Sequence, residues 1–231
     1  MRRAAIAAIL VAIAAGPALA GPITITQTQP FSGIPNYQTD LTFNQFDDLG
    51  GTLPLLSVEV IVTLNVDGGR LVLDNDGVDP AAGTFEFGAK GNISSVDVAL
   101  LNALSQPVTS EVSAIHSGGF NLAGNVGDVP TDFDPAPPDG MQYDGGPETD
   151  ADSGFIGSAY YAGYIGTGTF DVKASIAQWA DFGGVSGIEW AVTPVTSSGT
   201  VQVIYTVPEP AAMMLLVSGG AIVLLRRRRR A

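Results

Sequence analysis

The 231-residue sequence contains no cysteine, a single histidine and no sustained amphipathic helical pattern. The absence of cysteine excludes disulfide bonds, thiol nucleophiles and thiolate metal sites. The single histidine, His116, excludes a multi-histidine metal site, and a serine triad would have to be centred on it. Stability must therefore come from a hydrophobic core.

Basic residues are scarce between the two ends of the chain. Seven of the ten lysines and arginines lie in the first three and last six residues. Residues 21–207, the central region, hold three basic against 22 acidic side chains, a formal charge of −19. A field of this sign repels phosphate backbones, so we expect no nucleic-acid partner, whereas it favours solubility and divalent cations.

The start of the chain has the pattern of a secretory signal. Two arginines precede an apolar run at residues 4–15, and Ala18 and Ala20 form a small-x-small cleavage site. This pattern predicts a signal peptide over residues 1–20 and export by Sec-type machinery. The alternative is a short membrane anchor that stays attached. The remaining central region, 187 residues, is long enough for one domain.

The end of the chain combines an apolar run at residues 211–225 with a cluster of arginines. As a helix, the run would span about 22 Å, which is short of the roughly 30 Å of a bilayer core, so we expect a provisional anchor. Basic residues flanking a membrane segment stay in the cytoplasm, so the central region should face outward, into the periplasm. The basic residues of the cluster are Arg226, Arg227, Arg228, Arg229 and Arg230.

Two prolines separate the central region from the apolar run, in the order Val207, Pro208, Glu209, Pro210. Proline fixes φ and removes an amide donor, so the segment should be extended and accessible to a processing enzyme. The sequence from 208 to 231 resembles the PEP-CTERM sorting signal of Gram-negative bacteria, whose carriers are processed by membrane enzymes called exosortases. The alternative is an ordinary C-terminal anchor.

The resemblance has implications for location and partners. It implies an intermediate in the inner membrane, processing near the Pro-Glu-Pro triplet by an exosortase-like enzyme, and a final location at the cell surface or outside the cell. Proteins with this signal are associated with extracellular polysaccharide, which the resemblance makes a candidate partner.

The central region has the alternation and turn residues of β-strands. We expect an antiparallel β-sandwich or jelly roll, flanked by a signal helix and a membrane helix. The predicted strands cover residues 23–27, 57–64, 70–74, 83–88, 94–100, 168–174, 188–193 and 200–206. Residues 98–104 fit a strand end followed by a helical turn, and this interpretation stays open. Residues 128–153, rich in Asp, Pro and Gly, predict a long acidic surface loop.

Several short segments of the central region resemble the choice-of-anchor E domain. They are residues 43–47, 51–53, 57–60, 164–171 and 199–205. The resemblance implies a β domain attached to a surface-sorting tail, and it carries no activity with it.

A candidate calcium turn contains Asp74, Asp76 and Asp79, with a glycine after the second aspartate. An EF-hand is excluded because its twelfth position falls on Phe85, an apolar residue. A looser calcium site and a plain acidic hairpin turn stay open as alternatives. A second calcium candidate, against a solvated loop, is formed by the acids of the predicted loop: Asp132, Asp134, Asp139 and Asp144.

Catalytic signals are absent, and we assign no catalytic residue. His116 lacks a nucleophile elbow and is expected in a loop, and residues 166–169 lack the lysine of a phosphate loop. With 22 acids, a pair at glycosidase spacing is uninformative. Trp179 and Trp190 fit either a sugar-stacking role or, more commonly, a sandwich core.

The sequence therefore predicts an exported surface or matrix protein with a non-catalytic structural role in biofilm or envelope. The first alternative is a calcium-stabilised glycan-binding module that uses Tyr160, Tyr161 or Tyr164. An extracellular hydrolase is the second. Exposed aromatics on a sheet would favour the glycan-binding module, and a convergent carboxylate pair in a cleft would favour the hydrolase.

Overall fold

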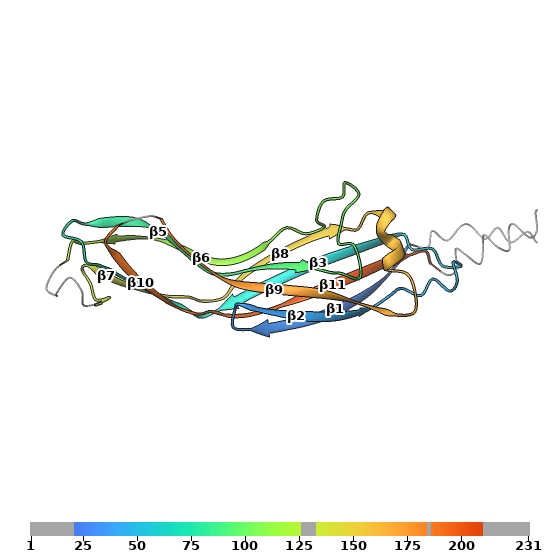
Figure 1. Cartoon of the computed structure of the whole chain (residues 1–231), viewed down its shortest axis with the longest axis horizontal. Helices are drawn as coiled ribbons and strands as arrows, with labels where there is room; N and C mark the ends of the chain where they lie inside the picture. Colours follow the sequence, from blue (N-terminus) through green and yellow to red (C-terminus); the bar gives the residue numbers. More distant parts are fainter. Residues whose placement is uncertain (1–20, 126–132, 184–185, 210–231) are drawn as a thin grey trace, which may run out of the picture. The chain divides into compact units, whose positions relative to one another are not determined.

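The computed structural model describes residues 21–125, 133–183 and 186–209 (Figure 1). The chain divides into two compact units. One comprises Met1–Ile23 and Pro208–Ala231, of which only residues 21–23, 208 and 209 are described. The other, Thr24–Val207, is the body, and the functional features discussed below lie in it or directly follow it.

The described residues form eleven strands and one short 3-10 helix, which confirms the predicted all-β, antiparallel class (Figure 1). The strands are β1 (Ile23–Gly33), β2 (Tyr37–Asn44), β3 (Ser57–Asp67), β4 (Arg70–Asn75), β5 (Ala81–Ser94), β6 (Val112–Leu122), β7 (Gly140–Asp144), β8 (Glu148–Phe155), β9 (Thr169–Phe182), β10 (Ile188–Thr193) and β11 (Thr196–Val207). The 3-10 helix is η1 (Ser158–Gly163).

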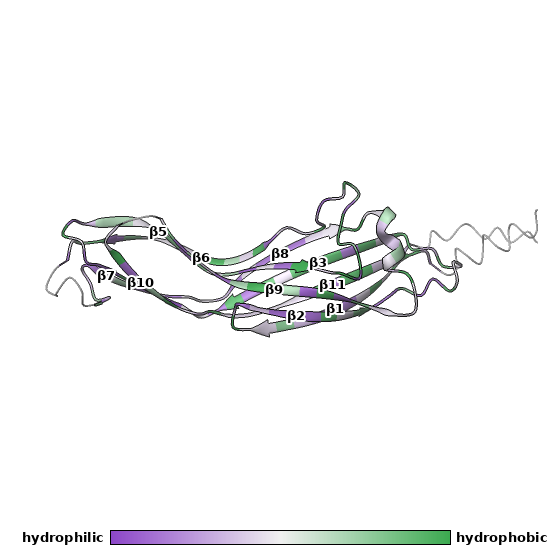
Figure 2. Ribbon diagram, viewed as in Figure 1, coloured by the Kyte–Doolittle hydropathy of each residue, from purple (hydrophilic) through white to green (hydrophobic). Residues whose placement is uncertain are grey.

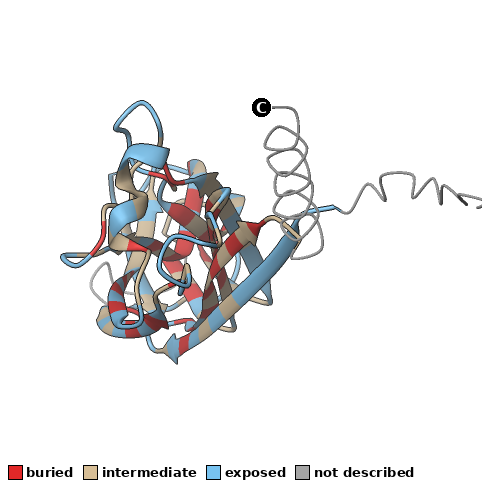
Figure 3. Cartoon of the chain, turned by 90° about the vertical axis from the view of Figure 1, so that its right-hand side faces the viewer, coloured by how far each residue is buried: buried red, intermediate tan, exposed pale blue. Residues whose placement is uncertain are grey.

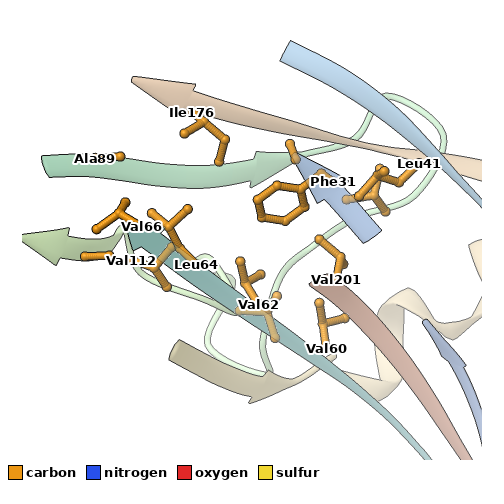
Figure 4. Close-up of a cluster of buried hydrophobic side chains, with 14 of the residues drawn as sticks. Phe31, Leu41, Val60, Val62, Leu64, Val66, Ala89, Val112, Ile176 and Val201 are labelled. Atoms are coloured by element: carbon orange, nitrogen blue, oxygen red, sulfur yellow. The ribbon is translucent and has the colours of Figure 1, made fainter. Parts of the chain in front are cut away.

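Two four-stranded sheets form the layers of a sandwich. One has the order β1-β11-β3-β8 and the other the order β2-β9-β5-β6. Figure 4 shows Val60, Val62 and Leu64 of β3 on one side of the core. Ala89 of β5 and Ile176 of β9 lie on the other side. The space between the sheets is therefore filled by side chains from both layers, as in other aligned sandwiches.

Alternation of side chains along each strand explains this burial. In β3 every second residue from Val58 to Val66 is buried, and the residues between them are partly exposed. Hydrophobic and hydrophilic positions accordingly follow one another along the strands in Figure 2, and in Figure 3 the buried positions lie in the interior. The β-branched residues of β3 suit such a half-buried pleated surface.

The third sheet, of order β10-β4-β7, covers one end of the long strands β5 and β6 (Figure 1). Its contact is aromatic: the ring centroid of Tyr143 in β7 lies 5.0 Å from that of Phe85 and 5.9 Å from that of Phe87, both in β5. Leu71 and Leu73 of β4 are also fully buried. The hydrophobic core of the sandwich thus continues into the space between the third sheet and β5.

Side-chain hydrogen bonds join the two sheets of the sandwich along both edges. At one edge, the amides of Gln27 and Gln29 in β1 donate to backbone carbonyls of β2, at 2.8 and 2.7 Å. At the other edge, the carboxylates of Asp150 and Asp152 in β8 accept backbone N–H groups at the start of β6 and just before it, both at 2.6 Å. Edge strands with unpaired backbone groups invite association, and these contacts occupy several of those groups.

Three sequence-based expectations about the body are wrong. The predicted loop at residues 128–153 contains β7 and β8, because pairing with β4 and β3 supplies the backbone partners that its composition does not suggest. The predicted strand at residues 94–100 is absent, because the Ser95 hydroxyl accepts the N–H groups of Asp97 and Val98 and turns the chain just after β5. His116 lies in β6, not in a loop. Residues 98–104, left open above, form neither a strand end nor a helix but a turn with one isolated bridge between Leu101 and Pro107.

Candidate functional site

The body ends where the predicted sorting signal begins. β11 finishes at Val207, whose side chain is buried, and the carbonyl of Thr206 accepts the N–H of Leu56 at 2.8 Å. Pro208 and Glu209 follow directly and lie outside the strand. Proline has no amide to donate, so the ladder cannot continue through Pro208. The start of the Pro-Glu-Pro triplet therefore follows the last strand with no linker between them.

The other predicted sorting and topology residues lie outside the described residues. They are Ala18, Ala20, Pro210, the apolar run at 211–225, and Arg226, Arg227, Arg228, Arg229 and Arg230. The predicted signal helix and membrane helix belong to the same regions. Among the described residues, none of the helices has the length and apolar character needed to span a membrane.

The predicted calcium turn does not gather its three carboxylates into one site. Asp74 is buried, and its Oδ2 accepts the backbone N–H of Asp134 at 2.7 Å, whereas Asp76 is half-buried and Asp79 is exposed. The turn is fixed by Asn75, whose side-chain amide donates to two backbone carbonyls at 2.9 and 2.6 Å. Within residues 21–125, 133–183 and 186–209, no group of three or more His, Cys, Asp or Glu side chains is placed to hold a metal ion.

The acids of the second calcium candidate are dispersed. Asp132 lies outside the described residues, and the chain at Asp134 and Asp139 packs against the same turn, with the carbonyl of Asp139 accepting the N–H of Asn75 at 3.1 Å. Asp144 is elsewhere, at the end of β7. Hydrogen bonds from Arg70 and then Gln142 hold the pKa of the Asp144 carboxyl below its usual value. The Asp74 turn and the chain at Asp134 and Asp139, which were separate calcium candidates, thus lie together, whereas Asp144 lies apart from both.

His116 is a core residue, with 2% of its surface exposed. Its ring centroid lies 4.9 Å from that of Phe87, and its Nδ1 lies 3.8 Å from a carboxylate oxygen of Glu148. Residues 166–169 are also structural, because the side-chain oxygen of Gln45 accepts the N–H of Gly168 at 3.2 Å and fills the space beside Gly166. Neither segment presents a nucleophile or an open phosphate cradle.

The three tyrosines proposed for glycan binding are engaged within the fold. Tyr164 is fully buried, and its hydroxyl donates to the carbonyl of Ala99 at 3.0 Å. Burial also raises the pKa of Tyr164. Tyr160 and Tyr161 are half-buried in η1, and their hydroxyls bond to Ser105 at 2.8 Å and to the Leu56 carbonyl at 3.3 Å. The prediction that these residues form a stacking surface is therefore wrong for Tyr164, which is buried. Tyr160 and Tyr161 are unfavourable stacking residues, because their hydroxyls are bonded within the fold.

The two tryptophans also lie outside the core, contrary to the commoner expectation. Trp190 in β10 is 51% exposed, and its ring centroid lies 4.3 Å from that of Phe182 at an edge of the third sheet. Trp179 is half-buried on the outer face of the β2-β9-β5-β6 sheet, opposite Gly88 of β5. Alternation along β9 carries a signal for this, because Phe170 to Ile176 are buried at even positions and Trp179 has an odd number.

Charged side chains surround Trp179 on this outer face. The indole Nε1 donates to Glu86 Oε2 at 3.2 Å, and Lys90 Nζ lies 3.5 Å from the ring centroid, the geometry of a cation–π contact. Lys90 also lies 3.5 Å from a carboxylate oxygen of Glu111. Glu86 and Lys90, which flank Gly88 along β5, therefore contact the indole nitrogen and the face of the ring, respectively.

Two shallow depressions flank this group. One, of about 370 Å³, is lined by residues that include Lys90, Asn92, Glu111 and Ser175. The other, of about 400 Å³, includes Glu86 together with Thr84, Ser117 and Asp181. Since Lys90 borders one and Glu86 the other, Trp179 stands between them. The lining is mixed: charged and polar side chains alternate with apolar ones such as Tyr37 and Ile176 in the first depression and Phe85 in the second.

Comparison with protein families identifies the C-terminal signal. Residues 206–230 match the PEP-CTERM protein-sorting motif, which confirms the predicted signal of an exosortase substrate. The protein is therefore exported, with a transient membrane anchor at its C-terminus, and is processed there. The match covers only the tail and the last residues of β11, so the resemblance of the central region to a choice-of-anchor E domain stays a prediction.

No curated protein matches the chain. Solved structures of infectious bursal disease virus, one of the Gx strain and one of the VP2 subviral particle, align over 88% of this chain and 49% of theirs. The identities are 12% and 14%, and the TM-scores are 0.17 and 0.14. The chain spans about half the length of these viral chains. A likeness at these TM-scores carries no argument about fold or function.

Proposed function

We propose that this protein is a surface or matrix protein whose body has a non-catalytic, structural role in an exopolysaccharide-rich envelope or biofilm. After Sec-type export the body faces the periplasm while the tail holds it at the inner membrane. An exosortase-like enzyme then processes the chain near the Pro-Glu-Pro triplet, and the body remains at the cell surface or outside the cell. In this proposal the body is a β domain of the choice-of-anchor E type.

The observation that supports this proposal most is the junction between body and signal. The sorting motif begins at residue 206, inside β11, and Val207 is still part of the core. Cleavage upstream of Pro208 would therefore remove residues that the fold needs, whereas cleavage within or after the triplet leaves the body whole. A self-contained body next to an expendable tail is what a sorted surface protein requires.

The non-catalytic role is supported by the way the reactive groups of the body are used. His116 is buried beside Phe87, and Asp144 is paired with Arg70. Asp150 and Asp152 bond to the backbone around the start of β6. Carboxylates engaged in this way hold the fold together and are poor candidates for acid–base catalysis.

The processing step is tested by intact mass spectrometry of the protein from cells with and without the candidate processing enzyme. We expect loss of the residues after the triplet only when the enzyme is present. Glu209→Ala should leave the full tail attached, and the control Glu189→Ala, on the exposed strand β10, should be processed normally. A full-length, membrane-retained chain in both strains would overturn the proposal and indicate a plain anchor.

A glycan-binding module is a second candidate function, and the half-buried position of Trp179 on the outer face of the sheet favours it. The sheet face around Trp179 carries an outward aromatic ring and two depressions with mixed polar and apolar linings. An outward aromatic ring gives a sugar ring a surface to stack on, and the polar groups beside it can bond to its hydroxyl groups. The structural role and the glycan-binding role are compatible, since a matrix protein has to contact its matrix.

A further inference from the structure

We propose that the outer face of the β2-β9-β5-β6 sheet is a binding site for a neutral, extended polysaccharide, with Trp179 as its stacking platform. The proposal rests on the proposed location of the protein in an extracellular matrix and names the surface through which the body contacts it. The site contains Trp179, Lys90, Glu86, Asn92, Glu111 and Ser175.

The position of Trp179 is the first support for this site. Directly across from Trp179, β5 has Gly88, so the ring has no side-chain neighbour at that pairing position. Two side chains on the same face of the sheet orient the ring: the indole Nε1 donates to Glu86 Oε2 at 3.2 Å, and Lys90 Nζ lies 3.5 Å from the ring centroid. A large aromatic ring placed on a polar sheet surface, and fixed there, gives binding area at low cost in conformational entropy.

The two depressions supply room on both sides of the ring. Outward-facing residues of β9 run from Ser175, in the first depression, through Trp179 to Asp181, in the second. At about 3.4 Å per residue this is roughly 20 Å, enough for several consecutive sugar rings. A linear glycan along β9 would therefore contact both depressions and cross the indole between them.

The charges of this face argue for a neutral ligand. Lys90 is matched by Glu111 at 3.5 Å, and Lys173, further along β9, lies 3.9 Å from a carboxylate oxygen of Asp40. The lysines of the face are therefore already balanced, while the central region as a whole carries −19. A polyanion such as a nucleic acid or a uronic-acid polymer meets a repulsive field, whereas hydroxyl groups can bond to the paired charges and to Asn92.

Lys90 has a defined part in binding. Its ammonium group covers a face of the Trp179 ring in the free protein, with Nζ 3.5 Å from the ring centroid. Glu111 is a second partner, with its Oε1 3.5 Å from the same Nζ. A sugar ring that stacks on the indole displaces the ammonium toward Glu111, where it keeps a charge partner. The exchange requires a side-chain movement and no change in the backbone.

The test uses tryptophan fluorescence of the full chain in detergent, because the two tryptophans can be separated by substitution. Trp190→Phe leaves Trp179 as the only tryptophan, and Trp179→Phe leaves Trp190. The probe is the neutral polysaccharide fraction isolated from the extracellular matrix of the producing cells. We expect a saturable change in emission from the Trp190→Phe protein and none from the Trp179→Phe protein.

Affinity electrophoresis in gels containing the same fraction gives a second readout. Removing an aromatic anchor at the centre of a binding surface should weaken binding by about 30-fold, so we expect that loss for Trp179→Ala. Trp190→Ala, which removes an equally large ring at another edge, should leave binding within about twofold. Asn92→Ala is a milder variant of the same site and should weaken binding while the far-ultraviolet circular dichroism stays unchanged.

Absence of binding, equal binding by Trp179→Ala and wild type, or preference for an acidic fraction would overturn the proposal. These results are independent of the processing test. A processed protein that does not bind would refute this site and leave the proposed function standing. A chain that binds through Trp179 but keeps its tail in both strains would support this site and refute the proposed processing.

Discussion

Substitution of Gly88 by alanine tests how closely neighbouring strands approach within the β2-β9-β5-β6 sheet. Gly88 lies in β5 opposite Ile115 of β6 and opposite Trp179 of β9. A Cβ added at this position would lie 2.3 Å from the carbonyl oxygen of Ala114 and 2.9 Å from Cα of Ile115. Both are backbone atoms of β6, which is paired with β5, so neither can move aside as the end of a flexible side chain would.

The expected magnitude follows from the rigidity of that contact. Forcing an extra methyl group into a packed site costs about 1–3 kcal/mol, and here the obstacle is backbone, so we expect a loss at the upper end, about 3 kcal/mol. For a domain of this size, about 1 kcal/mol corresponds to 2–4 °C, and the Tm should fall by about 6–12 °C. The displaced β5 should also alter the environment of Trp179.

The matched control is Gly119→Ala in the neighbouring strand β6. At Gly119 the nearest atom to an added Cβ is the Gly83 carbonyl oxygen, at 3.6 Å, which is ordinary van der Waals contact. This substitution should change the free energy of unfolding by less than about 1 kcal/mol. Urea unfolding and thermal melts measure both proteins. Equal stability of Gly88→Ala and Gly119→Ala would show that β5 and β6 do not approach as closely as the structure places them.

Three further predictions concern pH and metal. Burial raises the pKa of Tyr164 and Tyr205, so the stability that their neutral forms provide is present below about pH 10 and is lost as the pH rises above it; phenolate absorbance should show both tyrosines titrating only with unfolding. Titration of all six tyrosines in the folded protein would contradict this. Hydrogen bonds from Ser110 lower the pKa of Asp152, so its contribution is present above about pH 4 and is lost as the pH falls through the lowered value. Asp152→Asn should therefore lower the free energy of unfolding at pH 7 by about 1 kcal/mol, measured by urea unfolding, and should change it little at pH 2. Equal effects at the two pH values would contradict the role of the Asp152 carboxylate. Because the Asp74 to Asp79 turn does not gather its carboxylates, millimolar calcium or a chelator should leave the Tm unchanged, and a rise of several degrees with calcium would show a site that the described residues do not form.

The strands that could be predicted from the sequence are those in which alternation and burial agree. Residues 57–64 and 200–206 lie within β3 and β11, where every second side chain enters the core. β8 could not be predicted, because its sequence Glu148–Phe155 has acidic and small residues where a core strand has apolar ones. It is a strand because its backbone pairs with β3 and its carboxylates bond to the segment around the start of β6. Such strands are determined by tertiary partners, which composition does not report.

The candidate sites divide in the same way. The sorting signal is a local sequence of fixed order, so the motif at residues 206–230 could be predicted from the sequence, whereas a metal or ligand site depends on which segments meet. The chain at Asp134 meets the Asp74 turn, but as a backbone N–H donating to a carboxylate, and no spacing rule foresees that. The outward position of Trp179 could be predicted, because the alternation of buried residues along β9 places it on the outer face. The general preference of tryptophan for cores predicts the opposite and is wrong here.

The way the edges are sealed bears on how the body meets its surroundings. Gln27 and Gln29 occupy backbone groups along one edge of the sandwich, and Asp150 and Asp152 do so along the other. Pairing of these edges with another chain would require breaking hydrogen bonds that are already made, and like charge on every copy of the body adds repulsion. Assembly through strand addition at these edges is therefore disfavoured. In the matrix role proposed for this protein, the contact surface is therefore expected on the faces of the sheets, and the outer face around Trp179 has both an aromatic ring and depressions beside it.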